Sequence, residues 1–159
     1  MEEKRFSGSD IIEIAVEIEK NGYDFYTRLT RQLRDAKARE AFAFMADEEK
    51  KHIEDFKNIL GAVIKYDPCE AYPQEYFSYL NSIASEYVFT KKDELKERMA
   101  NIGTDKEAID FSLGLEKDSI LFYEEMKKIV PEKDKALIDS IISQEKGHVE
   151  KLWGLRKTL

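Results

Sequence analysis

Two short stretches, EKKH at residues 49–52 and EKGH at residues 145–148, decide how this chain is expected to fold. They contain the only two histidines in the sequence, and each histidine follows a glutamate by three residues. Residues three apart lie on one face of a helix, where a carboxylate and an imidazole can bind the same metal ion. The two stretches therefore predict two helices that each carry part of a metal site.

Each Glu–His pair lies within a row of apolar residues that has helical spacing. The rows comprise Phe42, Met45, Phe56, Ile59 and Val63 around the first pair, and Ile141, Leu152 and Leu155 around the second. Glu49, His52, Glu145 and His148 fill the gaps in these rows, so all four are predicted to face the core. A buried carboxylate is costly unless it is paired or coordinates a metal ion, and metal is the simplest compensation here.

Two further glutamates occupy positions where an apolar residue is expected. Glu19 lies between the small residues Ala15 and Gly22, in a row that also contains Ile11, Tyr26, Leu29 and Leu33. Glu116 lies in a row with Ile109, Leu113, Ile120 and Tyr123. The core is therefore predicted to hold four carboxylates and two imidazoles.

The composition favours an all-α protein, because the chain has only 7 Gly and 3 Pro and long stretches of helical spacing. We expect one domain over residues 1–159, built as a four-helix bundle from two helical hairpins. The helices are expected to start at Ser9 or Asp10, after Asp35, after Thr104 with Glu107 completing a capping box, and at Pro131. The second is expected to end near Gly61 and the fourth near Arg156.

Residues 62–104 are predicted to form a long crossover connection between the hairpins, because Pro68 and Pro73 interrupt it. Short helices are expected within it at about residues 74–82 and 91–101. Its aromatic side chains are expected to cover the bundle or a subunit interface; they are Tyr72, Tyr76, Phe77, Tyr79, Tyr87 and Phe89.

The first half of the chain resembles the second. Glu19 precedes Glu49 by 30 residues, and Glu116 precedes Glu145 by 29. Folding each hairpin at its turn brings its two glutamates to the same height, because a helix rises about 1.5 Å per residue. If the hairpins pack face to face, all four glutamates and both histidines meet in one layer.

Two divalent cations would neutralise the four carboxylates of this layer. Glu49 and Glu145 are then the expected bridges between the metals, and Glu19 and Glu116 the terminal ligands, with one histidine on each metal. Such an oxygen-rich set suits iron or manganese, and zinc can occupy it. Two Fe(II) ions give up one electron each, which matches the two-electron reduction of peroxide.

Other residues around this layer are predicted to have lesser roles. Tyr26 and Tyr123 lie seven residues after Glu19 and Glu116, where they could hydrogen-bond the ligands or simply pack in the core. Five other glutamates are expected on solvated helix faces: Glu48, Glu54, Glu124, Glu125 and Glu150. Cys69 is the single cysteine, so no intramolecular disulfide or Cys-x-x-Cys metal site can form.

The net charge of −7 argues against binding to nucleic acid and to anionic membrane surfaces. The first residues lack the apolar stretch of a signal peptide, and no run approaches 18 apolar residues. We therefore expect a cytoplasmic protein.

With these residues, the sequence resembles the rubrerythrin branch of the ferritin-like superfamily. Six residues carry the resemblance: Glu19, Glu49, His52, Glu116, Glu145 and His148. It implies a ferritin-like four-helix bundle with a di-iron centre, often in a homodimer. It also implies hydrogen peroxide reduction, reaction with dioxygen or Fe(II) oxidation in oxidative-stress defence.

The sequence departs from that family at two places. Rubrerythrins usually carry a rubredoxin module with four cysteines, so electrons are expected to come from a separate protein such as a rubredoxin. The family's peroxidases have an extra carboxylate where this chain has Leu113. Three alternatives to a peroxidase therefore stay open: a ferroxidase of ferritin type, an oxidase of organic substrates, and a bundle without metal.

Overall fold

The computed structural model of this chain describes residues 8–66, 75, 78–80, 82–83, 91–128, 130 and 132–159. The regular elements among these residues are all helices. They are α1 (Gly8–Thr30), α2 (Ala36–Tyr66), α4 (Lys92–Ala100), α5 (Asp105–Met126), a 3-10 turn (Glu132–Asp134) and α6 (Lys135–Arg156). The prediction of an all-α protein is confirmed. None of these helices combines the length and the apolar character that crossing a bilayer requires.

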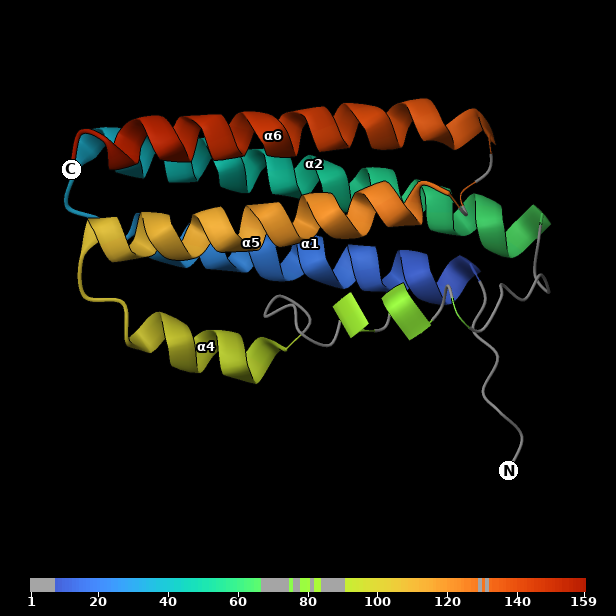
Figure 1. Cartoon of the computed structure of the whole chain (residues 1–159), viewed down its shortest axis with the longest axis horizontal. Coiled ribbons are helices and arrows are strands. Elements are labelled where there is room, and N and C mark those ends of the chain that lie inside the picture. The colour runs from blue at the N-terminus through green and yellow to red at the C-terminus, as the bar shows by residue number, and fades with distance from the viewer. Residues whose placement is uncertain are drawn as a thin grey trace.

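The four long helices form two hairpins that pack against each other. Helix α1 packs along α2, and α5 packs along α6, while the hairpins meet through α2 against α6 and α1 against α5. Figure 1 shows these four helices side by side, with the short helix α4 outside them on the α1 and α5 side. This is the four-helix bundle that the sequence predicted.

The helix starts predicted from capping residues are confirmed at Asp35 and Thr104. Asp35 Oδ1 accepts a hydrogen bond from the Ala38 amide at 2.8 Å, which caps α2. Thr104 Oγ1 accepts one from the Glu107 amide at 3.1 Å at the start of α5. The Glu107 carboxylate accepts from the Gly103 amide at 3.0 Å, one residue earlier than a standard capping box would have it.

Gly61 and Pro131 were the predicted end of the second helix and start of the fourth. The expected end of the second helix near Gly61 is wrong, because α2 continues to Tyr66. Gly61 keeps a negative φ, so it does not adopt the left-handed conformation by which glycine ends a helix. Pro131, the expected start of the fourth helix, lies outside the described residues, and α6 itself begins at Lys135.

The predicted connection is described in part. Helix α4 confirms the short helix expected at residues 91–101, and residues 75, 78–80 and 82 of the other one are helical. Of the aromatic residues expected to cover the bundle, Tyr79 is 48% exposed. The others lie outside the described residues: Tyr72, Tyr76, Phe77, Tyr87 and Phe89.

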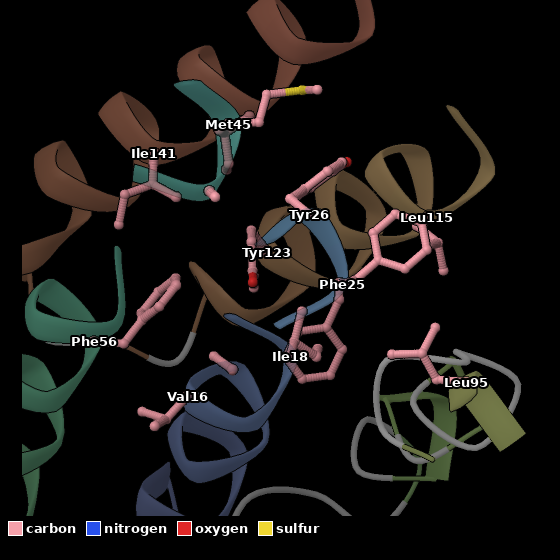
Figure 2. Close-up of a cluster of buried hydrophobic side chains, with 14 of the residues drawn as sticks. Val16, Ile18, Phe25, Tyr26, Met45, Phe56, Leu95, Leu115, Tyr123 and Ile141 are labelled. Carbon is pink, nitrogen blue, oxygen red and sulfur yellow. The ribbon is translucent and has the colours of Figure 1, made fainter. Parts of the chain in front are cut away.

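Helix α4 covers one side of the bundle. Leu95 and Met99 are buried in the main core cluster, and Figure 2 shows Leu95 reaching from α4 towards the buried side chains. The Arg98 guanidinium lies over the Phe111 ring of α5, 5.0 Å from its centroid. The connection thus contributes apolar area to the core as well as joining the hairpins.

Two aromatic contacts join the buried tyrosines of α1 and α5 to helix α2. The Tyr26 ring packs edge-on against Phe42 with centroids 5.2 Å apart, and Tyr123 packs against Phe56 at 5.0 Å. All four rings are fully buried. The Tyr26–Phe42 contact lies within the first hairpin, whereas the Tyr123–Phe56 contact joins the second hairpin to the first, so α2 packs against a tyrosine of each hairpin.

Asp105 links the start of α5 to the turn between α1 and α2. Its carboxylate accepts hydrogen bonds from the Arg34 amide at 3.0 and 3.1 Å and from the Asp35 amide at 2.7 Å. This contact joins the two hairpins at one end of the bundle and sets their heights relative to each other.

We expect Asp105→Ala to lower the free energy of unfolding by about 1–3 kcal/mol, because charge-assisted bonds to two backbone amides are lost. Urea denaturation would measure this change. Lys106→Ala, at the neighbouring exposed position, is the matched control and should change stability by less than about 0.5 kcal/mol. Equal stability of both variants would contradict a structural role for Asp105.

Candidate metal centre

The six residues predicted as metal ligands lie together in the middle of the bundle. They are Glu19 from α1, Glu49 and His52 from α2, Glu116 from α5, and Glu145 and His148 from α6. Each of these residues is between 1% and 4% exposed. The structure therefore confirms that all six face the core, and we refer to them below as the Glu–His cluster.

The Glu–His cluster consists of two overlapping groups that could each hold a metal ion. The first, called here the His52 half, contains Glu19, Glu49, His52 and Glu145. The second, called the His148 half, contains Glu49, Glu116, Glu145 and His148. Within each half, one ligand atom from every residue lies within 4.8 Å of the others. Glu49 and Glu145 belong to both halves, the positions that bridging carboxylates need.

Both histidines direct the same ring nitrogen at the carboxylates. His52 Nδ1 lies 2.9 Å from Glu145 Oε1 and 3.5 Å from Glu19 Oε2. His148 Nδ1 lies 3.3 Å from Glu145 Oε2 and 3.5 Å from oxygens of both Glu49 and Glu116. The two rings are nearly parallel, with an interplanar angle of 28° and centroids 6.4 Å apart. Nδ1 is therefore the nitrogen that would bind metal.

Most of the inward-facing atoms of the Glu–His cluster contact only one another and have no hydrogen-bond partner outside the cluster. These buried atoms are Glu19 Oε2, Glu49 Oε1, Glu116 Oε2, both carboxylate oxygens of Glu145, and Nδ1 of His52 and of His148. An unpaired buried polar atom costs roughly 1–3 kcal/mol, and more when it is charged. Two divalent cations would satisfy these atoms and balance four negative charges, so the donor set fits the metals predicted for it.

Without metal, burial and mutual repulsion perturb the carboxylates unequally. Burial, together with the charge of Glu145, raises the pKa of Glu49 well above its usual value and that of Glu116 to about 8. Burial acts in the same direction on Glu19 and Glu145, but hydrogen bonds from neighbouring side chains and the nearby histidines outweigh it and lower their pKa. The metal-free cluster therefore shares its charge unevenly.

The two histidines respond in the opposite way. Burial lowers the pKa of each ring, but the surrounding carboxylates outweigh it and raise the pKa of both His52 and His148 to about 11. Without metal, both rings are thus protonated and partly neutralise the cluster. Because a metal ligand must give up that proton, metal binding would release protons from Nδ1.

Two buried tyrosines hold the terminal carboxylates from the opposite hairpin. The Tyr26 hydroxyl of α1 donates to Glu116 Oε1 of α5, and the Tyr123 hydroxyl of α5 donates to Glu19 Oε1 of α1 at 2.5 Å. Burial and the charge of Glu116 raise the pKa of Tyr26, so its hydroxyl keeps its proton. Figure 2 shows both tyrosines among the buried side chains. Tyr26 and Tyr123 therefore do both things that the sequence suggested: their hydroxyls hydrogen-bond the glutamates, and their rings pack in the core.

One predicted surface residue belongs to the site instead. Glu48 was expected on a solvated helix face, but it is 19% exposed and its Oε2 lies 2.5 Å from His148 Nε2. Gln144 makes the equivalent contact, with Oε1 2.5 Å from His52 Nε2. The internal repeat could have indicated these two residues, because they directly precede the EKKH and EKGH stretches. Helical periodicity missed them because they lie beside the apolar rows.

The sequence also predicted positions for Leu113 and for four further glutamates. Leu113 lies in the core one turn before Glu116, so this position provides no carboxylate. Glu54 and Glu150 are exposed, as expected. Glu124 and Glu125 are half-buried and lie near Lys127 and Lys128.

The pKa shifts predict how the stability of the metal-free protein depends on pH. The raised pKa of Glu116 contributes stability that is present below about pH 4.5 and is lost as pH rises through about 8. The raised values of both histidines contribute stability that is present below about pH 6.5 and is lost towards pH 11. The lowered values of Glu19 and Glu145 matter only in acid.

We therefore expect the metal-free protein to lose stability between about pH 6 and pH 9. Glu116→Gln should reduce this loss by at least about 1 kcal/mol, roughly the equivalent of one pKa unit. Urea denaturation in the presence of a chelator would measure both effects. Glu54→Gln, an exposed change of the same kind, should behave like the unchanged protein. A stability that is constant from pH 6 to pH 9 would contradict this account of the cluster.

Comparison with known proteins agrees with this geometry. No curated protein matches the chain. The structure is similar to a proposed ferritin-like diiron-carboxylate protein from Thermotoga maritima, with a TM-score of 0.68 and 26% sequence identity over 98% of this chain and 97% of the other. The model of the rubrerythrin family matches residues 10–155. The chain therefore belongs to the rubrerythrin family.

Proposed function

We propose that the Glu–His cluster binds two metal ions, iron in the cell, and that the protein is a non-haem di-iron oxidoreductase. We propose hydrogen peroxide, or else dioxygen, as its substrate in oxidative-stress defence. The observation that carries this proposal is the pair of buried four-residue groups that share Glu49 and Glu145. In a metal-free bundle these buried atoms would have only one another as partners, which is a costly arrangement for four carboxylates.

Each residue of the cluster has a distinct proposed role. Glu49 and Glu145 would contribute to both metal positions, because both belong to both halves. Glu19 with His52 completes one half, and Glu116 with His148 completes the other. These four residues would be the terminal ligands. Carboxylates with one imidazole per metal favour iron or manganese, and zinc is a further occupant of such a set.

Two iron ions bound there would supply one electron each. Two electrons and two protons convert one hydrogen peroxide molecule into two water molecules, so the electron count matches. Tyr26 and Tyr123 would hold Glu116 and Glu19 in place through their hydroxyl groups. The fully buried Phe42 and Phe56 rings pack against these tyrosines, one before and one after the Glu49–His52 stretch of α2.

The electron donor and the assembly are also part of this proposal. Residues 1–159 contain a single cysteine and cannot form a four-cysteine iron site, so we propose that a rubredoxin-type site outside these residues returns electrons to the centre. We propose a homodimer, and light scattering coupled to size exclusion would test it. A large hollow particle would instead favour iron storage.

We expect protein reconstituted with Fe(II) under anaerobic conditions to bind about two iron ions per chain. Glu49→Ala combined with Glu145→Ala should abolish binding, because both halves lose two ligands. Glu54→Gln, exposed on the same helix as Glu49, is the control and should bind iron normally. Elemental analysis would give the stoichiometry, and circular dichroism would show that each variant is folded.

Rapid mixing of the iron-loaded protein with peroxide, and separately with oxygen, would identify the oxidant. Faster oxidation by peroxide would support a peroxidase even with Leu113 in place of a carboxylate. Fast reaction with oxygen and iron uptake beyond two per chain would favour a ferroxidase. A folded protein that binds no iron, unaffected by loss of Glu49 and Glu145, would contradict the proposed metal centre.

A further inference from the structure

The two halves of the Glu–His cluster match in their inner residues but differ directly behind the histidines. Each half takes one terminal glutamate, one histidine and the two shared glutamates. The residue that precedes the motif is Glu48 in α2 but Gln144 in α6. Glu48 reaches His148, and Gln144 reaches His52, each at 2.5 Å from Nε2. The two candidate metal positions therefore have different groups behind equivalent ligands.

A carboxylate and an amide constrain an imidazole ring differently. An ionised carboxylate can only accept a hydrogen bond, so Glu48 requires a proton on His148 Nε2. That leaves Nδ1, which faces the cluster, as the nitrogen with a lone pair once it gives up its proton. The amide of Gln144 offers either its oxygen or its NH2 group, so it accommodates a proton on either nitrogen of His52.

The negative charge of Glu48 also favours metal binding at His148. Glu48 adds a negative charge next to His148, which increases the electron density that the ring can donate to a metal. A divalent metal carries two positive charges and the proton that it displaces carries one, so this extra charge favours the exchange. Gln144 adds no charge at His52, and it is more exposed to water than Glu48.

We propose that Glu48 makes the His148 half the tighter metal position, which fills first, and that the His52 half, backed by Gln144, binds and releases metal more readily. Glu48 and Gln144 are positioning residues, because each acts through a histidine. This inference rests on the proposed di-metal function, and it adds an order of filling that the inner ligands alone do not predict.

The test uses Co(II), which fills such sites without being oxidised during the measurement. Calorimetric titration of the metal-free protein should show two binding steps per chain, with dissociation constants that differ by about 10- to 100-fold. Crystals grown with one equivalent of Co(II) should show anomalous scattering mainly beside His148 and Glu116. Neither readout depends on enzymatic activity.

Three variants connect the order of filling to the two outer residues. Glu48→Gln should weaken the first step and bring the two dissociation constants together. Gln144→Glu should instead strengthen the second step. The double variant Glu48→Gln/Gln144→Glu keeps the net charge and should move the first-filled position to the His52 half. Glu54→Gln, the same chemical change at an exposed position of α2, should leave both steps unchanged.

The outcomes separate this inference from the function on which it rests. Two bound Co(II) ions with equal occupancy at one equivalent, or an order of filling that the double variant leaves unchanged, would overturn the inference but keep the metal centre. No Co(II) binding by any form would overturn both. Should Glu48→Gln not fold, the strengthening expected from Gln144→Glu alone still decides the question.

Discussion

The burial of four carboxylates in one layer constrains the rest of this structure. Like charges repel strongly in a medium of low dielectric constant, so the bundle can hold them only with protons or metal ions among them. Without metal, the protonated rings of His52 and His148 provide part of the compensation, and Glu49 and Glu116 acquire raised pKa values. The inward-facing atoms have no hydrogen-bond partner outside the cluster, so the donor set suits cations bound among them.

The apolar residues around the layer offset the free-energy cost of burying the four carboxylates. Helices α1, α2, α5 and α6 bury rows of aliphatic and aromatic side chains on both sides of the cluster, and α4 adds Leu95 and Met99. Burial of apolar area contributes about 25 cal/mol per Å², which offsets a destabilised centre. The buried carboxylates thus lower the stability of the metal-free protein, while the fold holds the six cluster residues together. Such a loss of stability is common at functional sites.

The fold and the burial of the six cluster residues were predictable because they depend on periodicity along single helices. Glu19 and Glu116 could be recognised as site residues from the apolar residues around them, and the matched separations to Glu49 and Glu145 placed all four at one height. Asp35 and Thr104 could be recognised as caps, because capping is local. The end of α2 was not predictable from Gly61, since the backbone there stays helical.

Contacts between helices were harder to predict. Glu48 and His148 are 100 residues apart, and their contact depends on how α2 is rotated against α6. Periodicity within one helix does not report that rotation, so a side chain at the edge of an apolar row cannot be assigned to solvent or to a neighbouring helix. The hydroxyl contacts of Tyr26 and Tyr123 depend likewise on how the hairpins meet, which is why two roles stayed open for them.

The crossed tyrosine contacts also bear on how such a chain could arise. Tyr26 supports Glu116 and Tyr123 supports Glu19, so each hairpin completes the other's half of the site. Two identical copies of one hairpin, related by a twofold axis, would form the same layer from a peptide of half the length. Joining two such copies into one chain would free each copy to mutate independently. A difference such as Glu48 against Gln144 can exist only after that step, because an assembly of identical hairpins must carry the same residue on both sides.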